Sequence, residues 1–195
     1  MMNLDVSYLN TKQRVLYGKK VEESILNSLK HVGYDIKYPT IEEDTKYKID
    51  GYIKSKNKYL PIQIKYRSKR TDIIYEMTCI DDIYGNEKSD QKLSTFDGRD
   101  FISNAVIYVS LSCNCKTLRL CLAEDIRKNG IELTNILINK WRKNKNIKCY
   151  SNKYGQVKII TDNYSGIRKI IFFAKPEKCC IPSLIEINLK TPILV

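Results

Sequence analysis

The chain has 195 residues, of which 34 are Lys or Arg and 22 are Asp or Glu, so its formal net charge is +12. With 43% hydrophobic residues it can bury a core, which excludes a disordered basic tail. No segment approaches the roughly 20 apolar residues of a membrane span, and the N-terminus lacks the basic-then-apolar order of a signal peptide. We therefore expect no membrane partner and an intracellular location: the cytoplasm, or the nucleus or viral factory of a host cell.

The excess of positive charge favours a polyanionic partner. An abundance of Lys, Ile, Asn and Tyr is also typical of an AT-rich genome, which raises the Lys content independently of function. A solvated basic surface without a ligand therefore stays open as the alternative.

The seven cysteines are an odd number, and in an intracellular protein they are expected to be reduced thiols rather than a disulfide framework. The pairs Cys113/Cys115 and Cys179/Cys180 could bind zinc, although neither has the two-residue spacing of structural zinc knuckles. No internal repeat or Pro/Gly/Ser-rich boundary divides the chain. The sequence thus predicts a single domain over 1–195, with a core at about 11–125 and a C-terminal helix and strands at about 126–195.

The first predicted element is a helix over 11–32. Its apolar residues recur every three or four positions, which places them on one face. They are Val15, Gly18, Val21, Ile25, Leu29 and Val32. Gly33 follows at the position of a C-terminal cap.

A β-hairpin is predicted next, with strands Tyr47–Ile53 and Tyr59–Tyr66. The second strand alternates, with Ile62, Ile64 and Tyr66 on one face and Gln63 and Lys65 on the other. If the turn is centred between Lys56 and Asn57, antiparallel pairing places Asp50 opposite Gln63, roughly 5 Å apart. Polar residues on a solvated hairpin face are the simpler alternative.

The rest of the chain predicts further strands and one more helix. A strand over 73–80 precedes a polar stretch from Asp81 to Asp100, and Ala105–Ser112 and Thr117–Leu122 are predicted as paired strands. A helix over about 132–144 has an apolar side and a basic end. Late strands are predicted at Gln156–Thr161 and Arg168–Ala174.

Glu22 is the unusual residue of the first helix, because the spacing places it within the apolar stripe. A carboxylate on a buried face is costly unless a cation or a metal lies close to it. A small rotation of the helix, with Glu22 at the edge of the stripe, is the alternative explanation.

Together these residues resemble the core of the PD-(D/E)XK nuclease superfamily, in which a helical Glu precedes a hairpin with an Asp on one strand and an acid-x-Lys on the next. The helix here has Gly18-Lys-Lys-Val-Glu22, and the hairpin has Ile49-Asp50-Gly51 and Gln63-Ile64-Lys65. The glycine four residues before Glu22 is similar to archaeal Holliday-junction resolvases and Mrr-type restriction enzymes. The similarity covers roughly residues 11 to 70, and Gln63 replaces the usual acid, as in Mrr-type members.

The resemblance implies a restriction-endonuclease-like α/β fold, with a mixed central sheet flanked by helices, and a Mg²⁺- or Mn²⁺-dependent endonuclease acting on double-stranded or branched DNA. It implies metal ligation by Asp50, Glu22, the Gln63 side chain and the Ile64 carbonyl. Lys65 would position the attacking water and stabilise the transition state. By analogy alone, a homodimer would cut both strands.

Phosphate contacts are expected from three groups of basic residues. They are Lys54, Lys56 and Lys58; Arg67, Lys69 and Arg70; and Lys140, Arg142, Lys143 and Lys145.

Two alternatives to a DNA endonuclease stay open. The first is an inactive nucleic-acid-binding protein of the same fold, because Gln63 brings no charge to the metal. The second is an RNA-cleaving relative, since cap-snatching endonucleases of segmented RNA viruses combine a His with a similar hairpin. We expect His31, the one histidine, to have a surface or capping role instead.

Overall fold

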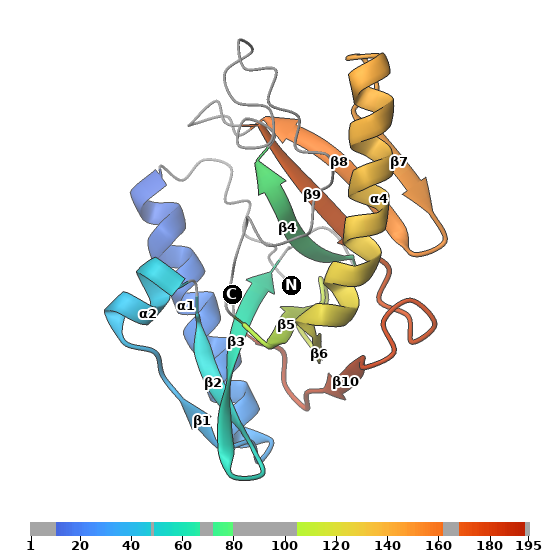
Figure 1. Ribbon diagram of the computed structural model, residues 1–195. Helices are drawn as coiled ribbons and strands as arrows, with labels where there is room; N and C mark the ends of the chain where they lie inside the picture. Colours follow the sequence, from blue (N-terminus) through green and yellow to red (C-terminus); the bar gives the residue numbers. More distant parts are fainter. Residues whose placement is uncertain (1–10, 48, 67–71, 80–104, 162–167, 194–195) are drawn as a thin grey trace. The chain divides into compact units, whose positions relative to one another are not determined.

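The computed structural model describes residues 11–47, 49–66, 72–79, 105–161 and 168–193 (Figure 1). The sequence predicts a single domain, whereas the contacts divide the chain into two compact units. Of the described residues, the first unit comprises 11–47, 49–66, 105–122 and 184–193, and the second comprises 72–79, 123–161 and 168–183. Helices pack with a mixed sheet in the first unit, so the expectation of an α/β fold is confirmed at this general level.

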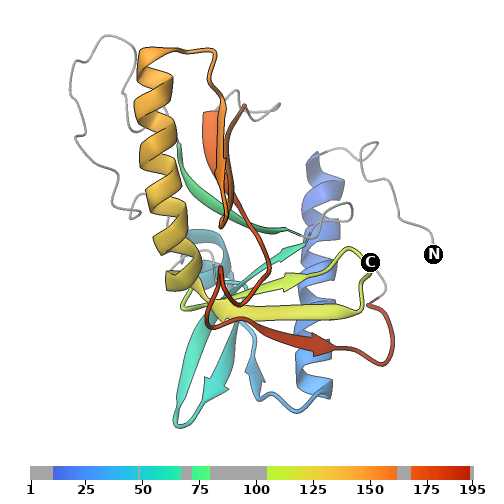
Figure 2. The ribbon, with the colours of Figure 1, turned by 90° about the vertical axis from the view of Figure 1, so that its right-hand side faces the viewer.

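In its described residues, the first unit contains two helices and a six-stranded sheet. The helices are α1 (Thr11–His31) and α2 (Ile41–Tyr47), and the strands are β1 (Ile36–Lys37), β2 (Gly51–Ser55), β3 (Lys58–Tyr66), β5 (Ile107–Leu111), β6 (Thr117–Leu122) and β10 (Ile185–Asn188). The strand order is β1-β2-β3-β5-β6-β10, and only the β3–β5 pair is parallel. Figure 2 shows β10 beside β6, although the two strands are far apart in the sequence.

Helix α1 matches the predicted 11–32 to within one residue. Val21, Ile25 and Leu29 are at most 3% exposed and belong to the same core cluster as Ile62 and Ile64 of β3. The helix ends in the expected glycine cap, because Gly33 has a φ of 99° and the next N–H donates to the Leu29 carbonyl. The prediction that Val32 is buried was wrong: it lies beyond the end of the helix and is 43% exposed.

The predicted hairpin register is confirmed. Gly51 pairs with Ile62 and Ser55 with Lys58, which centres the turn between Lys56 and Asn57. The predicted start of the first strand at Tyr47 was wrong, because Tyr47 is the last residue of α2.

A capping box starts α2. The Thr40 N–H donates to the Glu43 carboxylate, and the Glu43 N–H donates to the Thr40 hydroxyl. This short helix occupies the chain segment that connects β1 to β2, so the second strand of the sheet begins only at Gly51.

The described part of the second unit contains a four-stranded antiparallel sheet with helix α4 packed against it (Figure 1). Its elements are β4 (Ile73–Cys79), α4 (Ala123–Lys143), β7 (Cys149–Asn152), β8 (Gly155–Thr161) and β9 (Arg168–Ala174). The strands predicted at 73–80, 156–161 and 168–174 are confirmed to within one residue, whereas β7 and β10 were not predicted. The polar stretch from Asp81 to Asp100 lies outside the described residues.

The predicted start of the second helix, at about residue 132, was wrong by nine residues. Helix α4 runs through Gly130, a residue that is unfavourable inside a helix. Here the glycine is needed for packing, because a Cβ atom at this position would lie 2.5 Å from the Met77 sulfur. The buried face continues on both sides of it, with Ile126 and Leu133 both fully buried.

Candidate functional site

Asp50 lies directly before β2, and two hydrogen bonds attach it to β3. Its N–H donates to the Ile62 carbonyl at 2.9 Å, and its Oδ2 accepts the Ile64 N–H at 2.5 Å. A hydrogen bond to a charged acceptor is among the stronger ones in proteins. The hairpin therefore holds the half-buried Asp50 carboxylate in one place, next to Ile64, which lies between Gln63 and Lys65 in β3.

Glu22 of α1 lies near this carboxylate. Burial is the main cause that raises the pKa of Glu22 to about 7, and the negative charges of Asp50 and Asp44 raise it further. The positive charges of Lys65 and Lys19 act in the opposite direction. The structure thus brings Glu22, Asp50 and Lys65 within electrostatic range of one another, although they come from three separate elements.

Lys65 and Gln63 are both half-buried on the face of β3 opposite to Ile62 and Ile64. The β2–β3 pairing ends at Gly51 and Ile62, one residue before Gln63. Asp50 lies just beyond this pair, but its N–H donates to Ile62 rather than to Gln63, so the predicted pairing of Asp50 with Gln63 is not among the observed pairs. Lys65 lies two residues beyond Gln63 on the same face of β3.

Ser110 of β5 is the parallel-strand partner of Lys65. Its side chain is 6% exposed, and among the described residues its hydroxyl has no hydrogen-bond partner. Buried hydroxyls normally have one. A polar atom with unused hydrogen-bonding capacity therefore lies in the strand next to Lys65, and nothing in the sequence pattern of a buried strand indicated it.

Asp44 and Lys19 also belong to this region, and sequence analysis did not select them. The Lys19 ammonium lies 2.9 Å from the Asp44 carboxylate, and both charges act on Glu22. The sequence did contain a sign of Asp44, since the Thr40/Glu43 capping box starts a helix with an acidic first turn. We name Glu22, Asp44, Asp50, Gln63, Lys65 and Lys19 the acidic cluster.

The donors of the acidic cluster are carboxylate and amide oxygens, but the ligand atoms of its three carboxylates do not all lie within 4.8 Å of one another, as those of another group of the described residues do. Beyond the effect of burial, the charges of Asp50 and Asp44 raise the pKa of Glu22, and those of Lys65 and Lys19 offset part of this increase. Carboxylate and amide oxygens are the ligands that Mg²⁺ and Mn²⁺ prefer. A cation bound to Asp50 and Glu22 would replace their mutual repulsion by attraction.

The basic residues of the hairpin turn lie away from the acidic cluster. Lys54 forms an ion pair with Asp35 at 3.1 Å, and Lys56 and Lys58 are exposed. The strand from Lys58 to Lys65 spans about 23 Å at roughly 3.3 Å per residue. A phosphate in contact with these lysines would therefore be several nucleotides away from a phosphate in contact with Lys65.

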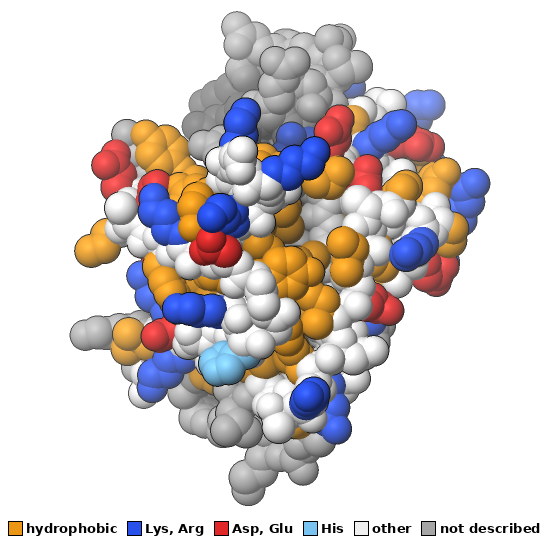
Figure 3. Space-filling view, turned by 90° about the horizontal axis from the view of Figure 1, so that it is seen from below, with side chains coloured by type: hydrophobic (Ala, Val, Ile, Leu, Met, Phe, Trp, Pro, Cys, Tyr) orange, Lys and Arg blue, Asp and Glu red, His pale blue; other side chains and the backbone are white. Residues whose placement is uncertain are grey.

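The other predicted phosphate-binding residues are divided between the second unit and the residues that are not described. Lys140 lies 4.5 Å from the centre of the Tyr150 ring, and Lys145 lies 3.3 Å from that of Trp141. Arg142 and Lys143 are exposed, and Arg67, Lys69 and Arg70 lie outside the described residues. On the face shown in Figure 3, Lys and Arg side chains are interspersed with hydrophobic and acidic ones, with the histidine at the surface.

The raised pKa of Glu22 predicts how stability depends on pH. Between its ordinary value of 4.5 and about 7, the folded protein keeps a proton that the unfolded chain has released. The free energy of unfolding therefore decreases as the pH rises through this window. In EDTA, Glu22→Gln should be more stable than wild type above pH 7, by about 1 kcal/mol after allowance for solvent screening, and equally stable near pH 4.

Urea denaturation at pH 4 and pH 8 measures this difference. Glu23→Gln provides the matched control, because it removes a carboxylate from the exposed neighbouring position of the same helix. A Glu22→Gln effect that does not vary with pH would contradict the assigned environment.

Comparison of the chain with protein-family models, with curated proteins and with solved structures finds no match. Among the described residues, no helix is both long and apolar enough to cross a membrane. The chemistry of the acidic cluster is therefore the observation that bears most directly on function.

Proposed function

We propose that this protein is a metal-dependent endonuclease that hydrolyses DNA phosphodiester bonds, with a restriction-endonuclease-like fold of the PD-(D/E)XK type. One observation carries the proposal. A helical acid, Glu22, interacts electrostatically with an acid and a lysine of an adjacent hairpin, Asp50 and Lys65. These are the residues of the resemblance, and they come close together in the folded chain.

The proposed roles follow from the chemistry of the residues. Asp50 and Glu22 would hold Mg²⁺ or Mn²⁺, assisted by the Gln63 side-chain oxygen and the Ile64 carbonyl. When bound, the cation supplies positive charge beside the phosphoryl oxygens and makes water more acidic. Lys65 donates hydrogen bonds to the attacking water and to the oxygen on which negative charge develops. The hydrogen bond from Ile64 to Asp50 keeps the carboxylate in position before the cation arrives.

The presence of Gln63 supports a second candidate function, that of an inactive protein of the same fold that only binds nucleic acid. An amide oxygen can ligate a hard cation but brings no negative charge, so cation affinity is lower than with an acid at this position. Asp44 contributes a further carboxylate in the same region, but the Lys19 ammonium, 2.9 Å away, offsets its charge. Cleavage activity therefore distinguishes the active enzyme from the binding protein.

Incubation with a panel of nucleic acids tests the proposal. Supercoiled, linear, nicked and branched DNA, together with RNA, are incubated with the purified protein in Mn²⁺, in Mg²⁺ or in EDTA. We expect nicked or linear products from DNA with either metal and none in EDTA. If RNA were cleaved and DNA were not, RNA would be the substrate of the enzyme. Saturable DNA binding without any product, together with no Mn²⁺ binding, would identify the binding protein instead.

A further inference from the structure

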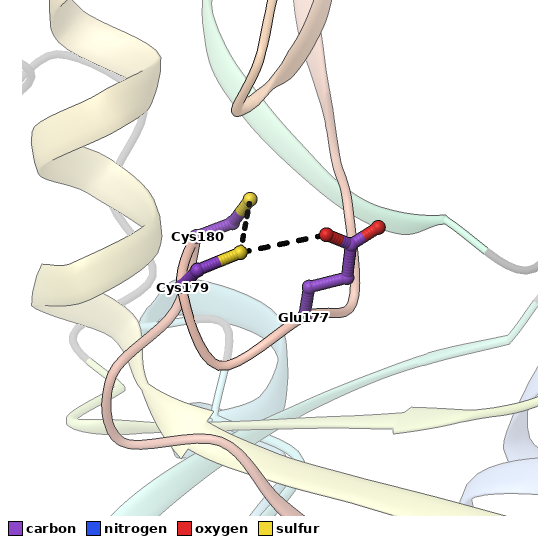
Figure 4. A group of neighbouring side chains, drawn as sticks. All are labelled: Glu177, Cys179 and Cys180. Atoms are coloured by element: carbon purple, nitrogen blue, oxygen red, sulfur yellow. Dashed lines mark hydrogen bonds between the residues drawn. The ribbon is translucent and has the colours of Figure 1, made fainter.

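A second group of metal-ligating side chains lies in the second unit, in the turn that follows β9. Glu177, Cys179 and Cys180 point toward one another (Figure 4), and their ligand atoms all lie within 4.8 Å of one another. The Cys179 sulfur is 3.4 Å from Glu177 Oε2 and 3.7 Å from the Cys180 sulfur. Cys180 is buried, whereas Glu177 and Cys179 are exposed, so solvent ions reach the group from one side.

These separations are those of a tetrahedral zinc site. With Zn–S near 2.3 Å and Zn–O near 2.0–2.2 Å, two ligand sulfurs lie about 3.8 Å apart, and a sulfur and an oxygen lie about 3.6 Å apart. The observed sulfur–sulfur distance of 3.7 Å and sulfur–oxygen distance of 3.4 Å agree with these expected separations. The Lys153 carbonyl oxygen is 3.5 Å from the Cys180 sulfur, so it or a water molecule could occupy a fourth position.

The backbone around the group is held in place. The N–H groups of Cys180 and Ile181 both donate to the Glu177 carbonyl, at 2.9 Å and 2.8 Å, which closes the turn. Two hydrogen bonds with helix α4 also hold the turn. The Asn129 amide donates to the Cys180 carbonyl at 2.6 Å, and the Ser183 N–H donates to the Asp125 carboxylate at 2.9 Å. A turn fixed in this way loses little conformational entropy when its three ligand side chains bind a cation.

We propose that Glu177, Cys179 and Cys180 form a binding site for a thiolate-preferring divalent cation of the Zn²⁺ class. Two thiolates and one carboxylate form a softer donor set than that of the acidic cluster, which has only oxygen donors. The protein therefore has two sites of different selectivity, Zn²⁺ at the turn and Mg²⁺ or Mn²⁺ at the acidic cluster. Zinc binding would fix the turn to the end of β9 and stabilise the second unit.

Binding releases one proton from each thiol to the solvent, and no atom is oxidised or reduced. Both thiols must be deprotonated to ligate zinc. Burial and the neighbouring Cys179 raise the pKa of the Cys180 thiol. Because metal binding releases protons, the apparent affinity for Zn²⁺ should increase with pH.

Cobalt titration of the full, reduced chain tests the site. Co²⁺ occupies zinc sites and gives a thiolate-to-cobalt charge-transfer absorption, and Zn²⁺ should displace it. We expect one equivalent of Co²⁺ with the absorption of two thiolates. Cys179→Ser should lower the affinity at least tenfold and halve the absorption, and Glu177→Gln should weaken binding while keeping both thiolate contributions.

Cys149→Ser is the matched control, because Cys149 is an exposed cysteine of the same unit and should not affect binding. Both test positions are exposed, and circular dichroism checks that the variants fold. Absence of charge-transfer absorption in the wild type would overturn the proposal. The proposal would also be overturned if the absorption survived in Cys179→Ser and Glu177→Gln but disappeared in Cys113→Ser. A Cys179–Cys180 disulfide that persists under reducing conditions would overturn it as well.

Discussion

Replacing Lys65 by Ala is expected to decrease the rate of DNA cleavage by about a hundredfold or more while leaving DNA affinity almost unchanged. The loss of one pre-aligned donor to the transition state typically costs about 3 kcal/mol. Lys65 is one charge among many on a chain of net charge +12, so its contribution to binding is small. Single-turnover cleavage and fluorescence anisotropy measure the two effects separately.

Lys58→Ala is the matched control for this experiment, because Lys58 is an exposed lysine at the other end of the same strand. It should cleave bound DNA at nearly the wild-type rate, because a phosphate contact at Lys58 would act on DNA affinity and not on the chemical step. Lys65→Ala should also raise the pKa of Glu22, since the Lys65 charge lowers it in the wild type. An NMR titration of Glu22 therefore tests the arrangement of the two residues even without an active enzyme. Wild-type cleavage by Lys65→Ala would exclude it as a catalytic residue.

The hairpin was predictable because its sequence pattern and its geometry depend on the same periodicity. Alternation places Ile62 and Ile64 in the core, and shifting the register by one residue would expose them. The polar turn then fixes which residues pair. The observed pairing of Gly51 with Ile62 is therefore the one that the sequence predicts.

The elements that were missed lack such periodicity. Helix α2 is seven residues long and has an acidic first turn, so only its capping box indicated it. Asp44 was missed for the same reason. The first half of α4 was missed because Gly130 is a poor helix residue, and its role depends on contacts with Met77 and Phe172, which are distant in the sequence.

The acidic cluster was only partly predictable from the sequence. The pattern selected Glu22, Asp50, Gln63 and Lys65, but their mutual effects depend on burial and on the charges of other elements. The unpartnered hydroxyl of Ser110 and the ion pair between Lys19 and Asp44 arise from tertiary packing. A single sequence gives no measure of either.

Asp50 has two roles in the structure, and two substitutions distinguish them. Asp50→Asn keeps an oxygen that can accept the Ile64 N–H but removes the negative charge. We expect it to lower Mn²⁺ affinity by about a hundredfold, because a charged ligand is lost, with little change in the free energy of unfolding. Removing the charge should also lower the pKa of Glu22, since Asp50 is one of the groups that raise it.

Asp50→Ala removes the acceptor as well as the charge. The Ile64 N–H then loses its partner, which costs about 1–3 kcal/mol of stability in a half-buried position. Isothermal titration with Mn²⁺ and urea denaturation in EDTA measure the two roles independently. If the proposed site is correct, both variants lose Mn²⁺ binding but only Asp50→Ala loses stability. Equal Mn²⁺ affinity in the wild type and Asp50→Asn would remove Asp50 from the metal site, because its carboxylate would then serve only to hold the hairpin.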